Sequence, residues 1–258
     1  PYVVLNVQRW GTGLGSLESG QADYNRDCKG GGHGDYHNIV YAPYNIQEMV
    51  DDIYNAWEIA EKYRIGVTIF SEAVLGQMME GVEMPPFKKR EGELDWGLDG
   101  TGTKGMRYPQ GAGKAVLDYE RKKYAAVTEE MQAWECYETD DAENVLVAFG
   151  LPARVCMDVV KKLRAEGEKV GLLRPRVLWP FPWKGFEELH EKNPNVKRFI
   201  SVETNDLGQM VDDVALAAKK AGYNVPTYCY AHSCGVPGVK KVTAEYRAIV
   251  NGDVKERY

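Results

Sequence analysis

Strand and helix patterns alternate without a break from residue 144 to residue 230, and this alternation constrains the fold more than any other feature of the chain. Short apolar runs are followed by helical apolar spacing, and Gly167 and Gly222 stop two of the helices. Such an order requires a parallel sheet with right-handed crossovers and helices on both faces. The expected strands are 145–149, 170–173, 198–203 and 227–230, and the expected helices are 152–166, 182–192 and 207–221.

The first 84 residues have the same character but contain fewer elements. Val3–Val7, Ile39–Tyr41 and Val67–Ser71 are short apolar runs typical of strands buried in a parallel sheet. A helix is predicted from Ile46, with Asn45 as its N-cap. Because two or three strands and one helix cannot cover both faces of a parallel sheet, we expect more chain before the first residue.

Residues 85–143 differ in composition from the segments on either side. The stretch "PPFKKREGELDWGLDGTGTKGMRYPQGAGK" is rich in glycine, proline and charge, and a charged amphipathic helix is expected near Leu117–Ala133. An irregular stretch of this length is uncommon inside a compact domain. We therefore predict an α/β protein with two parallel-sheet domains, residues 1–84 and 144–258, and a connector with one helix at 85–143.

Composition limits the classes of function. A net charge of −6 without a basic block argues against binding to nucleic acid, and the longest apolar runs have only the length of a strand, which predicts no membrane span. Five scattered cysteines without a C-x-x-C pair argue against an iron–sulfur cluster in this chain. Unpaired, scattered cysteines are also typical of the reducing cytoplasm, where we expect the protein.

The segment "LNVQRWGTGLGSLESGQADYNRDCKGGGHGDYH", residues 5–37, is rich in glycine and in side chains that bind ligands. A dinucleotide-binding turn would need a helix directly after Gly11, Gly13 and Gly15 and an acidic residue after the next strand, and the sequence indicates neither. A structural turn, in which glycine adopts backbone geometry closed to other residues, is the alternative.

Metal binding and anion binding are two further interpretations of this segment. Cys28, His33, Asp35 and His37 are four donors within ten residues, but their spacing matches no standard zinc pattern, so no metal site is predicted. Arg9 follows a strand and lies beside glycines, where a guanidinium can make a two-pronged contact with a carboxylate or phosphate. A surface ion pair is the alternative role for Arg9.

The second region offers arginines and a glutamate without a catalytic constellation. Arg154 and the "LRPRVLWPFP" segment, with Arg174 and Arg176, favour packing against a partner. Glu203 follows a strand, and no nucleophile or base is evident beside it in the sequence. No catalytic residue is therefore assigned in this chain.

Four stretches of the chain match one family in the same order. They are the segment from "VVLNVQRWGTGLGSLESGQADYN" to "GVTIFSEAVLGQMME", then "VLVAFGLPAR", "VGLLRPRVLWPFP" and "ETNDLGQMVDDV". Together they resemble the α subunit of the 2-oxoacid:ferredoxin oxidoreductases. The "KGGGHGDY" and "LGQMME" segments are most similar to the branch that acts on 2-oxoisovalerate and related branched-chain acids.

This resemblance implies a thiamine-diphosphate enzyme that decarboxylates a 2-oxoacid, reduces ferredoxin through iron–sulfur clusters and transfers the acyl group to coenzyme A. It implies a truncated pyrimidine-type domain in residues 1–84 and a transketolase C-terminal-like domain in residues 144–258. Thiamine diphosphate and Mg²⁺ would be held mainly by a partner β subunit, and γ and ferredoxin-like δ subunits would complete the complex, the clusters lying on another subunit. A pyruvate- or 2-oxoglutarate-specific member, a non-catalytic scaffold and a stand-alone nucleotide-binding module are the alternatives.

The resemblance also implies roles for particular residues. Arg9 matches the arginine of an Asn-x-x-Arg-Gly-Gly-Pro loop that faces the substrate carboxylate. The predicted substrate-binding residues are therefore Arg9, Trp10, Gly11 and Thr12, and Gln21, Asp23, His33 and Asp35 are expected to line or brace the loop.

Two features depart from the family pattern. Trp10 stands where the family has glycine, and an indole at this position would reshape a neighbouring pocket. Cys234 in "AHSCGVPG" has no counterpart in the resemblance. The cofactor-activating glutamate of the family would precede residue 1.

Overall fold

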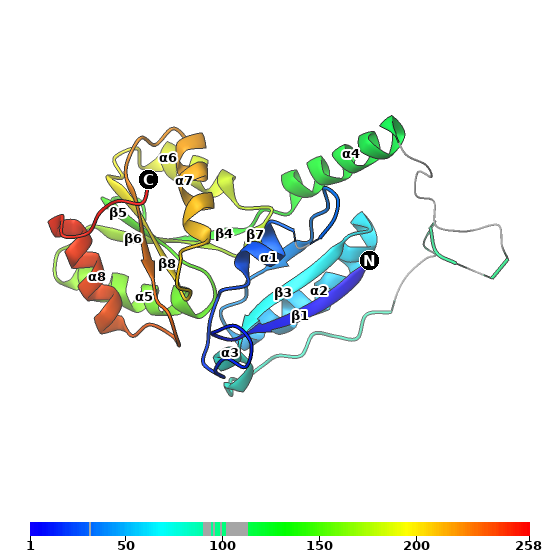
Figure 1. Cartoon of the computed structure of the whole chain (residues 1–258), viewed down its shortest axis with the longest axis horizontal. Helices are drawn as coiled ribbons and strands as arrows, with labels where there is room; N and C mark the ends of the chain where they lie inside the picture. The colour runs from blue at the N-terminus through cyan, green and yellow to red at the C-terminus, as the bar shows by residue number, and fades with distance from the viewer. Residues whose placement is uncertain (31, 90–93, 95, 99, 102–112) are drawn as a thin grey trace.

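Two β-sheets organise the chain (Figure 1), which a computed structural model describes for residues 1–30, 32–89, 94, 96–98, 100–101 and 113–258. The first sheet has the order β1 (Tyr2–Gln8), β3 (Gly66–Glu72), β2 (Ile39–Tyr41) and β7 (Val177–Trp179). The second has the order β4 (Trp134–Tyr137), β6 (Val170–Pro175), β5 (Asn144–Val147), β8 (Arg198–Glu203) and β9 (Thr227–Ala231). Neighbouring strands are parallel except for β7 and β4, each of which is an antiparallel edge strand.

Helices cover both faces of the second sheet. On one face α5 (Gly150–Ala165) packs against α8 (Val239–Asn251), and on the other α6 (Trp183–Lys192) packs against α7 (Met210–Lys220). Strand order reverses between β5 and β8, since β6 lies on one side of β5 and β8 on the other. In an open α/β sheet the crevice at such a reversal, outside the carboxyl ends of the strands, is where ligands bind.

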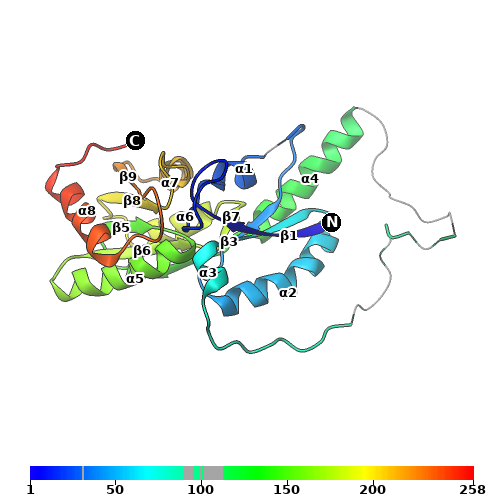
Figure 2. The same ribbon diagram turned by 60° about the horizontal axis from the view of Figure 1, so that its bottom comes forward.

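The first sheet packs differently on its two faces. Figure 2 shows α2 (Ile46–Tyr63) along one face, and the core there also receives Val127 of α4 (Lys114–Glu130). On the other face Phe149, which follows β5, packs against Phe70 and against Tyr24 of α1 (Tyr24–Cys28), with ring centres 6.0 and 5.9 Å apart. The two sheets therefore share one hydrophobic core.

One continuous run of backbone belongs to both sheets. Strand β6 of the second sheet ends at Pro175, and β7 of the first begins at Val177, so only Arg176 separates them. Its N–H donates to the carbonyl of Ala133 at 2.9 Å, and its carbonyl accepts from the N–H of Ala42 at 2.8 Å. The division into residues 1–84, 85–143 and 144–258 stays a prediction, and one strand of the last range lies in the first sheet.

The structure confirms the α/β class and each strand and helix predicted above, with small shifts at their ends. Helix α2 begins as expected, because the Asn45 side chain accepts a hydrogen bond from the N–H of Glu48 at 2.7 Å. The predictions above do not include α1, α3 (Ala73–Gln77), α8, β4 or β7.

The expectation that β1 is buried is wrong. This strand lies at the edge of its sheet, where Tyr2, Val4, Leu5 and Val7 are 43–47% exposed. Its apolar residues pair with β3 on one side only, so the apolar run reflects pairing within the sheet rather than complete burial.

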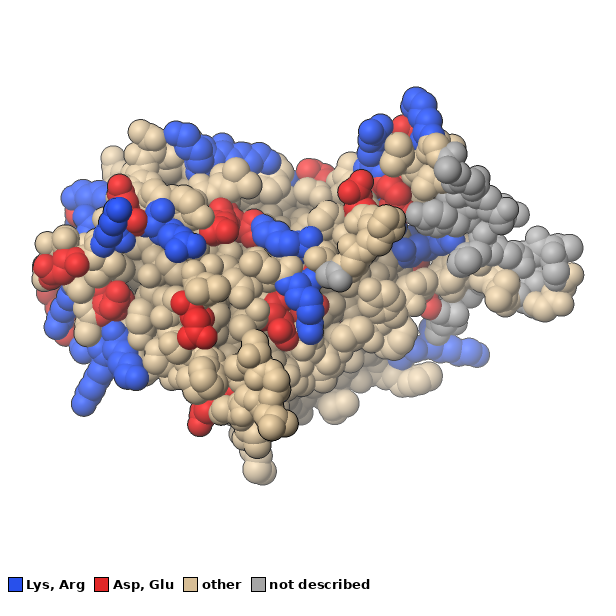
Figure 3. Space-filling view, viewed as in Figure 1, with Lys and Arg blue, Asp and Glu red and all other residues tan. Residues whose placement is uncertain are grey.

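Charges of both signs are interspersed over the face drawn in Figure 3. Within the residues that the structure describes, no helix combines the length and the apolar character needed to cross a bilayer.

Candidate functional site

Residues 9–20, the Arg9 loop, leave the carboxyl end of β1 and fold back on themselves beside α3 (Figure 1). The Arg9 guanidinium donates from Nη1 to the carbonyl of Trp10 at 3.3 Å and from Nη2 to the carbonyl of Gly13. A Cβ on Gly15 would lie 1.6 Å from Arg9 Nη1, and Gly15 has a φ of +45°, so glycine is required there. The guanidinium carries five N–H groups, and the two bonds inside the loop leave others for a ligand.

The base of the Arg9 loop is closed by backbone bonds. The N–H of Trp10 donates to the carbonyl of Glu18 at 2.8 Å, and the N–H of Ser16 donates to the carbonyl of Trp10 at 3.2 Å. Gly20 lies against this turn, since a Cβ there would be 2.9 Å from the Trp10 backbone. Among the described residues, the buried indole N–H of Trp10 has no hydrogen-bond partner.

The glycines of this loop act as turn residues. Gly11 and Gly13 have φ values of +86° and +60°, which glycine adopts without strain, and Gly11 and Thr12 are both exposed. The first helix after β1 begins only at Tyr24 and is five residues long. The geometry of a dinucleotide-binding turn is therefore not formed.

Gln21 occupies the crevice at the strand reversal of the second sheet. It is fully buried; its side-chain N–H groups donate to the carbonyl of Phe149 at 3.1 Å and to Glu72 at 3.0 Å, and its side-chain oxygen accepts from the N–H of Thr204 at 3.1 Å. Phe149 follows β5 and Thr204 follows β8. A side chain of the first region thus fills the place where such a sheet binds a ligand.

The other predicted bracing residues lie elsewhere. Asp23 is half-buried and accepts a bond from Asn6 at 3.4 Å. His33 and Asp35 are exposed, and their segment is anchored by His37, whose ring stacks on Trp179 at 4.3 Å. Within the described part of the chain, no group of His, Cys, Asp and Glu side chains is placed to hold a metal ion. The roles predicted for Asp23, His33 and Asp35 stay predictions.

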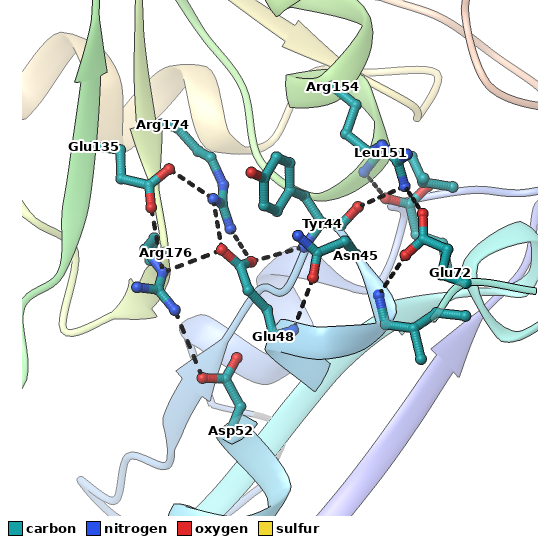
Figure 4. Close-up of polar contacts among 12 residues, drawn as sticks. Tyr44, Asn45, Glu48, Asp52, Glu72, Glu135, Leu151, Arg154, Arg174 and Arg176 are labelled. Carbon is teal, nitrogen blue, oxygen red and sulfur yellow. Dashed lines mark hydrogen bonds and ion pairs between the residues drawn. The ribbon is translucent and has the colours of Figure 1, made fainter. Parts of the chain in front are cut away.

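Glu72, at the carboxyl end of β3, is the buried group that sequence reasoning missed. Its carboxylate accepts bonds from the Ser19 hydroxyl at 2.8 Å and from Gln21 at 3.0 Å. It also accepts a bond from the N–H of Leu151 at 3.0 Å (Figure 4). Burial raises the pKa of Glu72 to about 7, against the opposing effect of these hydrogen bonds. A sequence signal for this site was available, because Glu72 is a carboxylic acid at the end of the apolar strand run "GVTIFSE".

Glu203 plays a structural part at the other strand end. It is fully buried and accepts bonds from the backbone N–H groups of Gln209, Met210 and Val211 at 2.7–2.8 Å. The first turn of α7 has no side-chain cap of its own, so Glu203 supplies the missing acceptors. The side chains of Ser201 and Asn205 also donate to it.

A charged cluster joins α2 to the second sheet (Figure 4). The buried Arg174 side chain bonds to Glu48 and, at 2.8 Å, to Glu135, and lies 3.7 Å from the ring centre of Tyr44. Arg176 lies 3.7 Å from Glu48. Arg174 and Arg176 thus pack inside the chain, and the predicted packing against a partner stays a prediction.

Asp52, beside this cluster, provides a test of its electrostatics. Burial raises the pKa of Asp52 to about 7, and Arg176 at 4.0 Å opposes this only partly. The folded chain therefore binds this proton more tightly than the unfolded chain, and stability contributed by the proton is lost as the pH rises. In the wild type we expect this ionisation to lower the free energy of unfolding by about 2 to 3 kcal/mol from about pH 5 to about pH 8, and in Asp52→Asn we expect this decrease to be absent. Urea unfolding of the wild type and of Asp52→Asn at both pH values measures these free energies. The same pH dependence in both proteins would contradict the prediction.

The "AHSCGVPG" segment after β9 closes on the Arg9 loop. The N–H of Gly235 donates to the carbonyl of Ser19 at 3.0 Å, and a Cβ on Gly235 would approach Glu18 to 3.2 Å. The neighbouring Cys234 is a partly buried free thiol, and the structure gives no role for it.

Comparison with known proteins is consistent over almost the whole chain. Residues 1–99 match the family "Pyruvate flavodoxin/ferredoxin oxidoreductase, thiamine diP-bdg", and residues 142–244 match "Pyruvate:ferredoxin oxidoreductase core domain II". The chain is 32% identical to 2-oxoglutarate synthase subunit KorA of Methanocaldococcus jannaschii, over 86% of this chain and 67% of that protein. The chain belongs to the 2-oxoacid:ferredoxin oxidoreductases. This confirms the family inferred from the sequence.

Among these oxidoreductases, the chain is more similar to a ketoisovalerate oxidoreductase subunit than to the 2-oxoglutarate synthase subunit. The chain is 42% identical to ketoisovalerate oxidoreductase subunit VorB of Methanothermobacter marburgensis, over 84% of this chain and 63% of that relative. The chain thus spans less than two thirds of this relative's length. A solved 2-oxoglutarate:ferredoxin oxidoreductase from Magnetococcus marinus shares the fold, with a TM-score of 0.72 over 95% of this chain and 48% of its own, at 20% identity.

Proposed function

We propose that this chain is the α subunit of a thiamine-diphosphate-dependent oxidoreductase that converts a branched-chain 2-oxoacid to its acyl-CoA and reduces ferredoxin. The observation that carries the proposal is the 42% identity to a ketoisovalerate oxidoreductase subunit, against 32% to the 2-oxoglutarate synthase subunit. In the reaction the bond between the carboxylate and the keto carbon breaks, CO₂ leaves, a thioester forms with coenzyme A, and two electrons pass to two ferredoxins.

In this proposal Arg9 binds the carboxylate of the 2-oxoacid. It lies at the carboxyl end of a parallel strand, and its guanidinium is partly exposed and held by two carbonyls of its own loop. A planar guanidinium fixed in this way can accept a carboxylate with little loss of side-chain freedom. Trp10, Gly11 and Thr12 would form the adjoining wall.

The remaining components belong to the assembled enzyme. Thiamine diphosphate, when bound, supplies the nucleophilic carbon that decarboxylation of a 2-oxoacid requires. A Mg²⁺ ion and the diphosphate would be held mainly by the partner β subunit, with γ and δ subunits, iron–sulfur clusters on another subunit and ferredoxin completing electron transfer. The chain would work in the cytoplasm.

Reconstitution tests the proposal. The α chain, in its full natural length, is combined with its β, γ and δ subunits and supplied with thiamine diphosphate, Mg²⁺ and coenzyme A. We expect viologen or ferredoxin reduction on addition of 2-oxoisovalerate, with slower turnover of pyruvate and 2-oxoglutarate. Preference for either of those acids would assign the corresponding branch, and no turnover of any 2-oxoacid would overturn the proposal.

A non-catalytic scaffold is the second candidate. The observation that favours it is that Trp10 stands where the family has glycine, since an indole there would reshape a neighbouring pocket. We expect Trp10→Gly to change the ratio of kcat/KM between 2-oxoisovalerate and pyruvate about tenfold, the size typical of a change in pocket shape. Trp10→Phe, which keeps a ring but removes the buried N–H, is the matched control. An inactive wild-type complex that gains turnover with Trp10→Gly would favour the scaffold.

A further inference from the structure

Three segments that are distant in the sequence meet at Glu72. They are the end of β3, residues 19–21 at the base of the Arg9 loop, and the first turn of α5 (Figure 4 shows the contact with α5). Glu72 and Ser19 are both buried. Gly150 makes the close approach possible, because it has a φ of +58° and a Cβ there would lie 2.3 Å from Glu72 Oε1.

The two oxygens of this carboxylate have different surroundings. Oε1 accepts from the N–H of Leu151 and from the side-chain amide of Gln21, both at 3.0 Å. The Gln21 amide cannot turn over, since the carbonyl of Phe149 needs its N–H groups and the N–H of Thr204 needs its oxygen. Oε1 therefore faces two donors, and a proton bound to Glu72 must sit on Oε2.

Oε2 faces the Ser19 hydroxyl at 2.8 Å. When Glu72 is ionised, this hydroxyl donates a charge-assisted hydrogen bond, which is stronger than a bond between neutral groups. When Oε2 carries a proton, the direction reverses, Ser19 accepts, and the bond becomes a neutral one. The two protonation states therefore hold Ser19 with different strength.

Ser19 is linked to Arg9 by a short path. The residue before it, Glu18, accepts the N–H of Trp10 at 2.8 Å, and Trp10 is bonded in the chain to Arg9. We propose that Glu72 is a positioning residue for the 2-oxoacid: its ionised carboxylate fixes the base of the Arg9 loop through Ser19, and protonation of Oε2 loosens it. This inference rests on the proposed function, in which Arg9 binds the substrate carboxylate.

The groups around Glu72 favour titration near neutral pH. Burial raises its pKa to about 7, whereas Ser19, Leu151 and Gln21 oppose the rise. The charged groups on the surrounding segments are engaged elsewhere: Arg9 bonds within its loop, Arg154 of α5 pairs with Glu80 at 2.7 Å, and Glu203 caps α7. Glu18 lies near Gly235, since a Cβ there would be 3.2 Å from its carboxylate, and α3 carries no charged residue. No ion pair of Glu72 is formed among the described residues.

Glu72→Gln in the reconstituted complex tests the proposal, because its amide can keep an oxygen at Oε1 and place N–H groups toward Ser19, like the protonated acid. In the wild type we expect the KM for 2-oxoisovalerate to be about fivefold to tenfold higher at about pH 6 than at about pH 8, with a smaller change in kcat. In Glu72→Gln we expect the high KM at both pH values.

Two further variants separate the effect of the Glu72–Ser19 hydrogen bond from general effects. Ser19→Ala removes only the hydroxyl and should give the same high, flat KM while Glu72 is retained. Asp52→Asn removes a second buried carboxyl whose pKa is raised to about 7, in α2 beside Arg176, and its KM profile should follow the wild type. A wild-type KM profile in Glu72→Gln, with normal turnover, would overturn the inference and leave the proposed function standing.

Hydrogen exchange gives a readout that does not depend on turnover. After correction for the intrinsic effect of pH, we expect amide protection in residues 10–20 to fall about fivefold in the wild-type complex from about pH 8 to about pH 6. Protection should stay constant in Glu72→Gln. This response in a complex that turns over no 2-oxoacid would refute the proposed function alone. Equal responses in both proteins would refute the positioning role of Glu72.

Discussion

Glu203→Gln is expected to lower the free energy of unfolding by about 3 to 5 kcal/mol, because its carboxylate is the buried acceptor for the start of α7. Both carboxylate oxygens accept: Oε2 from the N–H groups of Gln209 and Met210, and Oε1 from that of Val211. A glutamine side chain has one acceptor oxygen, so its NH₂ group would face backbone donors. At least one buried N–H would lose its partner, and the helix would lose a negative charge at its N-terminus.

Urea unfolding followed by far-UV circular dichroism measures this effect. Asp206→Asn, an equivalent change at an exposed position on the same turn, is the control and should alter stability by less than about 0.5 kcal/mol. Equal midpoints for Glu203→Gln and the control would mean that α7 does not depend on this carboxylate.

Arg9→Lys is expected to lower kcat/KM for the 2-oxoacid about 100-fold in the reconstituted enzyme, mainly through a higher KM. Lysine keeps the positive charge but lacks the planar pair of donors that matches a carboxylate. The change also removes the second bond to the loop carbonyls, since an ammonium cannot span Trp10 and Gly13 as the guanidinium does.

The two consequences for Arg9 can be separated. Thermal unfolding of the complex reports the loss of bracing, whereas the KM for the 2-oxoacid compared with the KM for coenzyme A reports carboxylate binding. Arg121→Lys, on the exposed surface of α4, is the matched control and should leave both constants unchanged. A normal 2-oxoacid KM in Arg9→Lys would remove Arg9 from the substrate site.

Local sequence patterns predicted the elements whose signals lie within one segment. Helix α2 is such a case, with a long apolar stripe and an N-cap at Asn45. Strand β7 has only three residues between Arg176 and a proline, too few for a period to appear. Helix α8 carried a usable signal, because Val242, Tyr246 and Ile249 have helical spacing and are all buried, and it was overlooked.

The site around Arg9 and Glu72 was predictable only in part, because some of its contacts join residues that are far apart in the sequence. The position of Arg9 after β1 followed from the strand pattern, and the glycine geometry followed from residue type. The contacts of Gln21 with Phe149 and Thr204 span 128 and 183 residues, and no local pattern encodes such pairing. The role of Glu72 could not be predicted either, because only the folded chain brings the N–H of Leu151 within hydrogen-bonding distance of its carboxylate.

The passage of one backbone through both sheets restricts how the molecule can deform. The N–H of Arg176 donates to the carbonyl of Ala133, and its carbonyl accepts from the N–H of Ala42. A wide hinge opening between the two sheets would break both hydrogen bonds. A small twist about this pivot preserves them. In the proposed enzyme, motions that admit substrate or release product are therefore expected to be slight rotations or local loop displacements, with both sheets moving together.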